Sequence, residues 1–330
     1  MASGTVATDT ARSGVFNYLD PEAEPSLFRN GKVLTRRDVD GSDAGFIGVH
    51  PTPYTLAVHD ARQRTGPEAM RCETNGFELL DAPLDKTAID FLDHQHVIHQ
   101  YYPLCEELVS GSTGALAFAF DHNVRSASGN ASGQRIDKGQ AVQGPAKMVH
   151  GDYTLTSAPA RLRDLALPPN INDTLRGVLG EGESLISSNM ADAALADSGR
   201  FAIINVWRNI ADEPVQTNPL AMCDGQTVDP TDLVTFEIHY ADRIGENYFA
   251  KYQDDHRFYF YPHMTRDEAM LLKQWDSAGA LAVSGGARAD AAASDGPCTF
   301  SFHSAFDDLT TPENAPDRWS IEVRCLVIYR

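Results

Sequence analysis

Short runs of apolar residues, each about the length of one β-strand, constrain the fold of this chain more than any other feature. They lie at residues 115–122 (ALAFAFDH), 201–208 (FAIINVWR), 298–306 and 319–329, and they are rich in aromatic and branched side chains. The runs do not alternate regularly with helical segments, and no GxGxxG motif follows a strand, which weighs against a doubly wound nucleotide-binding fold. The sequence therefore predicts a mainly β protein, a jelly-roll barrel with flanking α-helices.

The other segments predict one domain with two irregular stretches. Residues 1–14 are small and polar and predict a flexible N-terminal arm, which leaves residues 15–330 as a single domain. Residues 265–277 begin with a threonine, carry acidic residues early and place apolar residues at helical spacing, which predicts a capped helix. Residues 278–297 (AGALAVSGGARADAAASDGP) are low in complexity and predict a mobile loop.

The chain is acidic, with 27 basic and 46 acidic residues and a formal net charge of −19. Such a surface repels phosphate backbones and anionic lipids, which argues against nucleic acid and membrane as partners. No apolar run reaches the length of a membrane span, and the first residues lack the apolar core of a secretion signal. Five widely spaced cysteines without a CxxC motif predict reduced thiols, not disulfides or zinc knuckles. These features predict a cytoplasmic protein.

His150, Gly151 and Asp152 are the first candidates for a chemical site. On a β-strand, residues i and i+2 point to the same face, so the imidazole of His150 and the carboxylate of Asp152 would lie side by side. A histidine from another strand would complete the set of two histidines and one carboxylate that binds non-haem iron and leaves positions open. So short a motif also arises by chance in surface turns, and that alternative stays open at this point.

The C-terminal strands offer the missing partners. His303 lies in an apolar run, and Arg318 and Ser320 open the last strand with their side chains on one face. This order resembles an arrangement in which the arginine binds the far carboxylate of 2-oxoglutarate through two parallel hydrogen bonds and the serine adds another. Arg324 is an alternative anchor because it falls on the same face, and a surface salt bridge is the structural alternative for Arg318.

Four more residues are candidates for lining a substrate or cosubstrate pocket, namely Asn205, Arg208, His122 and Tyr153. Strand alternation places Asn205 on one face of the run 201–208 and Arg208 on the other. Arg208 could bind the acid end of a ligand or pair with a carboxylate at the barrel rim. His122 ends its strand, where most lone histidines are structural.

Several segments together resemble the AsaB-like group of 2-oxoglutarate oxygenases, which includes the fungal gibberellin desaturase and relatives of the cephamycin methoxylation protein CmcJ. The resemblance covers nearly all of the chain and rests on FNYLDP (16–21), VHDAR (58–62), GFELL (76–80), YYPLCEELV (101–109), FDHNVR (120–125), VHGDYT (149–154), INVWR (204–208), PLAMCD (219–224), FHSAFDD (302–308) and RWSIEVRCLV (318–327). The chain departs from the group at Asn209, where a proline is common, and in the longer segment 278–297. Both departures concern the pocket rim.

The resemblance implies a double-stranded β-helix fold and an oxidation in secondary-metabolite biosynthesis. It implies Fe(II) held by His150, Asp152 and His303, 2-oxoglutarate bound by Arg318, and O2 as the oxidant. The expected reaction is hydroxylation or desaturation of an unactivated C–H bond in a small molecule. The identity of the substrate does not carry over.

Two interpretations from other classes compete with the oxygenase. A cupin-like metalloenzyme would catalyse a non-oxidative step without 2-oxoglutarate and would not depend on Arg318. A barrel without catalytic activity would assist another tailoring enzyme and would not need three metal ligands. For the oligomeric state only the base rate of soluble enzymes applies, and it favours a homodimer.

Overall fold

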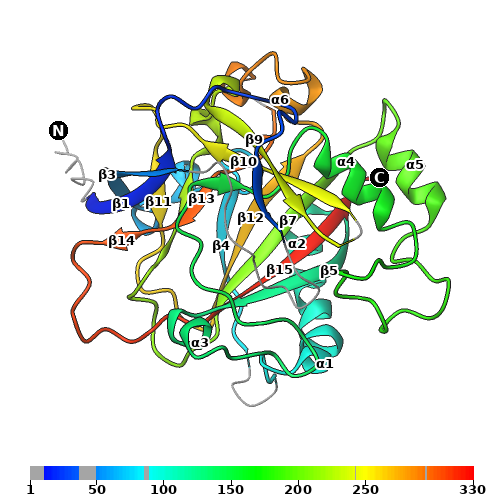
Figure 1. Ribbon diagram of the computed structural model, residues 1–330, viewed down its shortest axis with the longest axis horizontal. Coiled ribbons are helices and arrows are strands. Elements are labelled where there is room, and N and C mark those ends of the chain that lie inside the picture. The colour runs from blue at the N-terminus through cyan, green and yellow to red at the C-terminus, as the bar shows by residue number, and fades with distance from the viewer. Residues whose placement is uncertain (1–10, 37–49, 85–88, 242, 294–295) are drawn as a thin grey trace.

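Two β-sheets face each other and form the body of the protein (Figure 1), described here from a computed structural model. The structure describes residues 11–36, 50–84, 89–241, 243–293 and 296–330. The larger sheet has ten strands, in the order β14-β1-β3-β11-β8-β13-β6-β10-β9-β2, and the smaller has five, in the order β4-β12-β7-β15-β5. This mainly β architecture is the predicted jelly roll.

The strands of each sheet come from distant parts of the chain. The larger sheet contains β1 (Arg12–Leu19), β2 (Val33–Arg36), β3 (Pro51–Asp60), β6 (His150–Gly151), β8 (Leu220–Cys223), β9 (Leu233–His239), β10 (Ile244–Ala250), β11 (Phe258–Phe260), β13 (His303–Ala305) and β14 (Asp307–Asp308). The smaller sheet contains β4 (Phe77–Asp81), β5 (Leu116–Arg125), β7 (Phe201–Asn209), β12 (Glu268–Asp276) and β15 (Ser320–Ile328). The predicted strands at 115–122, 201–208 and 319–329 are confirmed as β5, β7 and β15.

Short helices flank the sheets. The α-helices are α1 (His94–His96), α2 (Tyr102–Thr113), α3 (Ala127–Ala131), α4 (Ser157–Asp164), α5 (Ser188–Leu195) and α6 (Ala280–Val283). Helix α2 packs against β5, β7 and β15 and covers the outer face of the smaller sheet. It ends at Gly114, whose φ of 68° is a left-handed conformation that glycine adopts without strain. Helix α4 contacts α5 and β10.

Residues 265–277 form a strand, not the predicted helix. In β12 every residue after Glu268 is buried, because one face packs into the main core through Ala269 and Leu271 while the other contacts a second cluster through Met270 and Leu272. A strand buried on both faces loses the alternation that marks a strand in the sequence. The backbone N–H of Thr265 does donate to the Glu268 side chain at 2.9 Å, but this bond closes a turn before the strand.

Two predicted irregular stretches differ from the structure. The predicted flexible arm at residues 1–14 includes Arg12 to Gly14, but these residues belong to β1 and pair with β3. Residues 1–10 lie outside the described residues. Within 278–297, the described part has a defined conformation instead of the predicted loop. Its buried Asp290 accepts hydrogen bonds from the backbone N–H groups of Leu281, at 3.2 Å, and of Thr299, at 2.6 Å. A single carboxylate thus organises an alanine-rich segment.

All five cysteines lie in the described ranges, and each is buried with a free thiol. None of the helices in the described part of the chain is both long and apolar enough to span a membrane.

Candidate metal centre

His150 and His303 are direct cross-strand neighbours in the larger sheet. The short strand β6 lies between β10 and β13, and its register places His150 opposite His303, with 4.3 Å between the two ring centroids. Asp152 follows β6 and brings its Oδ1 to 3.6 Å from the His150 Nε2. One ligand atom from each of the three residues lies within 4.8 Å of the others, and no other group of this kind occurs among the described residues. The structure thus brings together the three residues that the sequence analysis proposes as metal ligands.

Local contacts hold the His150 ring in one orientation. Its Nδ1 lies 2.7 Å from the carbonyl oxygen of Met148, and since a carbonyl only accepts, Nδ1 carries the proton and Nε2 keeps its lone pair for a metal. The neighbouring Gly151 allows this strand to approach Phe300, because a Cβ at position 151 would lie 2.9 Å from the phenyl ring. A larger residue would push β6 and its histidine away from β13.

The three side chains have the protonation states that metal binding needs. Burial lowers the pKa of both imidazoles to about 4, so both are neutral at pH 7. Burial alone would raise the pKa of Asp152, but the guanidinium of Arg324 and the two imidazoles hold it below its usual range. Two neutral imidazoles and one carboxylate form the donor set expected for Fe(II).

Arg324 donates hydrogen bonds to the carboxylate of Asp152, one of the three proposed metal ligands. Its Nε and Nη2 both donate to Asp152 Oδ2 at 3.2 Å, and its Nη1 donates to Asp121 Oδ2 at 2.9 Å. Asn205 donates a third hydrogen bond to Asp152 Oδ2, also at 3.2 Å. These donors occupy one carboxylate oxygen and leave Oδ1 facing His150. Arg324 is therefore not the alternative 2-oxoglutarate anchor, because it already pairs with the carboxylates of Asp121, Asp152 and Glu322.

Arg318 differs from Arg324 because it lacks a carboxylate partner. Its side chain is buried, lies over the Trp207 ring at 5.7 Å and donates through Nη1 to the carbonyl of Asn218. Its Nε has no hydrogen-bond partner, and it forms no ion pair with any carboxylate of the described residues. The buried hydroxyl of Ser320 also lacks a partner. A buried cation beside an unsatisfied hydroxyl fits an anionic ligand, so the residues present suit 2-oxoglutarate.

Two cavities meet at the triad. A narrow recess is lined by all three triad residues together with Arg125, Trp207, Arg318 and Glu322, among others. A second cavity of about 790 Å³ is lined by His150, Asp152, Tyr153, Phe120 and Phe249, among others, and has the size of a small-molecule site. Tyr153 lines the larger cavity together with His150 and Asp152, whereas Asn205 reaches the site through its hydrogen bond to Asp152. A further cavity of about 1000 Å³ lies beside α2 and touches none of the triad.

His122 and Arg208 face away from the metal. The Tyr102 hydroxyl lies 2.8 Å from His122 Nδ1 beneath α2, and Arg208 donates to the Tyr101 hydroxyl at 3.0 Å and to the Ala82 carbonyl at 2.7 Å. The prediction that His122 and Arg208 line the pocket at the metal centre is therefore corrected, since neither lines the two cavities that meet there. In β5 and β7, His122 and Arg208 lie on the outer face, under α2.

Three inward residues were missed by the sequence analysis: Asp121, Arg125 and Glu322. Asp121 and Arg125 flank the outward His122 and Val124 in β5, and Glu322 lies between Ser320 and Arg324 in β15. Asp121 and Arg125 lie in the segment FDHNVR, and Glu322 alternates with outward residues in β15, so strand alternation could have grouped each of them with the site residues. What was lacking was knowledge of which face of each strand points inward.

The buried His122 makes the free energy of unfolding depend on pH. Burial lowers its pKa to about 4, against an ordinary value of 6.5, so the unfolded chain binds more protons between these values. The neutral His122 contributes roughly 3 kcal/mol to the free energy of unfolding. This contribution is fully present above pH 6.5 and is lost as the pH falls through 4. We expect His122→Gln to flatten the dependence of the free energy of unfolding on pH between 6.5 and 4, measured by urea unfolding of the metal-free protein.

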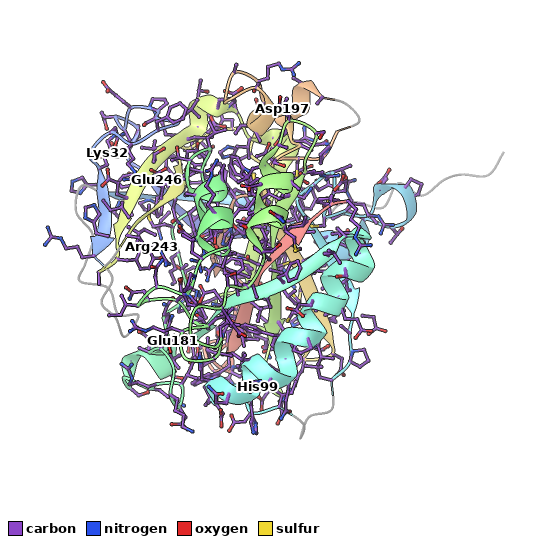
Figure 2. All side chains as sticks on the ribbon, turned by 90° about the vertical axis from the view of Figure 1, so that its right-hand side faces the viewer. Lys32, His99, Glu181, Asp197, Arg243 and Glu246 are labelled. Carbon is purple, nitrogen blue, oxygen red and sulfur yellow. The ribbon has the colours of Figure 1, made fainter. Side chains whose placement is uncertain are left out.

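The matched control is His99→Gln, which changes the exposed histidine labelled in Figure 2 beside α2. The variant at His99 should keep the slope of the native protein. Equal slopes for the His122 variant and the native protein would contradict the prediction.

Comparisons with known proteins agree with this geometry. A family model described as "Oxidoreductase/YMDC permease-like domain" matches residues 16–179 and 181–328. A protein encoded in the dcmA 3' region of Methylophilus leisingeri is 44% identical over 195 residues, which cover 59% of this chain and 88% of that protein. The Fe(II)/2-oxoglutarate-dependent dioxygenase nvfI of Aspergillus novofumigatus is 28% identical over 281 residues, 84% of each chain.

Another curated relative and a solved structure also resemble this chain. The hydroxylase/desaturase efuI of Hormonema carpetanum is 27% identical over 288 residues, 83% of each chain. Among solved structures, the iron and alpha-ketoglutarate-dependent endoperoxidase NvfI superposes with a TM-score of 0.69 at 24% identity, covering 97% of this chain and 98% of that one. The predicted resemblance to iron and 2-oxoglutarate oxygenases and the predicted double-stranded β-helix fold are confirmed by these matches.

Proposed function

The chain belongs to the oxidoreductase/YMDC permease-like domain family, and on this premise we propose that it is a non-haem Fe(II) oxygenase that uses 2-oxoglutarate. Its reaction is the oxidation of an unactivated C–H bond, by hydroxylation or desaturation, in a small intermediate of secondary metabolism. Relatives named hydroxylase/desaturase support this reaction class.

The observation that carries the proposal is the pairing of the triad with an unpaired buried cation. His150, Asp152 and His303 present three ligand atoms within 4.8 Å of one another. Arg318, in the adjoining recess, is buried without a carboxylate partner among the described residues. A metal site of a non-oxidative enzyme would have no need of this second feature.

Each residue then has a defined task. His150, Asp152 and His303 hold the iron, while Arg324 and Asn205 orient the Asp152 carboxylate. Arg318 and Ser320 bind the far carboxylate of 2-oxoglutarate. When iron, 2-oxoglutarate and O2 are bound, the centre supplies the oxidant that removes hydrogen from an unactivated C–H bond. The walls of the 790 Å³ cavity, Tyr153 and Phe120 among them, hold the substrate and exclude water.

Anaerobic titration of the metal-free protein tests this function. Fe(II) and then 2-oxoglutarate are added while the weak visible metal-to-ligand charge-transfer band is recorded. We expect the band with the native protein, and we expect it to be lost in His303→Ala and in Arg318→Ala. Bound iron without a band would favour a non-oxidative metalloenzyme, and the absence of iron binding would favour a barrel without catalytic activity.

We further propose that the enzyme acts in the cytoplasm on a small molecule, as a homodimer. The acidic surface and the five free thiols support the location, and the size of the cavity supports a small substrate. The dimer rests only on the frequency of such assemblies among soluble enzymes. Light scattering of the purified protein measures its mass directly, and a monomer would contradict this last part.

A further inference from the structure

Arg125 lies where the two cavities of the metal centre meet. It ends β5, directly opposite Ser320 of β15, and its Nη1 donates to the carbonyl of Gly144 at 2.9 Å. It lines both the narrow recess and the 790 Å³ cavity, and the other residues that do so are Ala146, His150 and Asp152. Arg125 is therefore placed on the metal side of the recess.

Arg318 shares the narrow recess with Arg125. It lines the recess but not the larger cavity. Both arginines line this one narrow recess, and Arg125 is paired with Ser320, two residues after Arg318, so the two cations are close to each other. Burial and, secondarily, repulsion by Arg125 lower the pKa of Arg318 to about 10.

We propose that Arg125 is a second positioning residue for the cosubstrate and holds the carboxylate of its 2-oxo acid end, while Arg318 holds the far carboxylate. This inference rests on the proposed function. Two neighbouring guanidiniums in a buried recess repel each other, and a dicarboxylate lying between them removes that repulsion. The negative charges of 2-oxoglutarate match the two cations in number, and the site therefore selects a dicarboxylate over a monocarboxylate.

A comparison of two ligands separates the two arginines. The probes are 2-oxoglutarate and 2-oxopentanoate, which keeps the 2-oxo acid end and carries a methyl group in place of the far carboxylate. Each is titrated anaerobically into Fe(II)-loaded native protein, Arg125→Gln, Arg125→Lys and Arg318→Gln, with the charge-transfer band as the readout of binding. Affinity for Fe(II) alone is measured first in every variant, which reports whether the metal site has kept its structure.

We expect Arg125→Gln to weaken both ligands by about tenfold or more, because both possess the carboxylate that it contacts. Arg318→Gln should weaken 2-oxoglutarate by a similar factor and leave 2-oxopentanoate unchanged. Arg125→Lys, which keeps the charge but not the fork, should lose less affinity than Arg125→Gln for both ligands.

The matched control is Arg243→Gln. This arginine lies just before β10, beside Glu246 in Figure 2, lines the larger cavity and is paired with Asp173 at 2.7 Å. Its removal takes one positive charge from the cavity wall, and neither ligand should be affected. The proposal is overturned if Arg125→Gln binds both ligands as the native protein does, if it weakens 2-oxoglutarate alone, or if Arg243→Gln reproduces its effect. If the native protein binds Fe(II) but neither ligand, the proposed function itself fails.

Discussion

Replacing Asp152 with alanine is expected to lower the affinity for Fe(II) by about a hundredfold or more and to abolish turnover. Loss of a residue that merely orients a metal ligand already costs about 10- to 100-fold in metal affinity, and Asp152 is the only carboxylate in the triad. The substitution also leaves Arg324 without the carboxylate oxygen that accepts from its Nε and Nη2. A buried cation is then placed beside the metal, which weakens binding further.

The measurement is calorimetric titration with Fe(II) under anaerobic conditions, followed by an assay of 2-oxoglutarate consumption. The control is Asp164→Ala, which removes a carboxylate from the wall of the larger cavity without touching the triad. It should bind iron as the native protein does. Native metal affinity in Asp152→Ala would remove Asp152 from the proposed ligands.

Arg318 and Arg324 are expected to affect the stability of the metal-free protein in opposite ways, although Arg318 lies just before β15 and Arg324 lies within it. Arg324→Gln should lower the free energy of unfolding by about 3 kcal/mol, because it leaves the Asp152 carboxylate, which is only 9% exposed, and the partly exposed Asp121 carboxylate without their cation. Arg318→Gln should leave the stability unchanged or raise it. Arg318 has no carboxylate partner among the described residues, so its removal relieves an uncompensated buried charge.

The increase in the free energy of unfolding that 2-oxoglutarate binding causes should depend on Arg318, although the stability of the metal-free protein does not. With Mn(II) bound, 2-oxoglutarate at about 100 times its Kd stabilises the native protein by about 3 kcal/mol. In Arg318→Gln this protection should be lost at the same ligand concentration. Urea unfolding with and without ligand gives both quantities. A strongly destabilised metal-free Arg318→Gln protein would show that Arg318 is a structural residue and not a ligand contact.

The sequence by itself determined the strands β5, β7 and β15 and the set of His150, Asp152 and His303. The strands depend on a local pattern, because a run of apolar residues marks a buried strand. The set of three residues was proposed from the resemblance of the segments around them, and Asp152 itself lies after β6. The opposite orientation of Asn205 and Arg208 followed from the two-residue period of a strand. The fold class followed from the absence of regular strand and helix alternation.

Only the tertiary structure decided which face of each strand points toward the metal. Alternation along β5 separates His122 from Asp121 and Arg125, but the position of α2 and of the opposite sheet determines which of them lies inside. The same holds for the two arginines. Strand alternation places Arg318 and Arg324 on the same face, and only the tertiary structure shows that Arg324 is already paired with carboxylates far away in the chain whereas Arg318 is not. The strand β12 was predicted as a helix because burial of both its faces removes the alternation of apolar and polar residues that marks a strand.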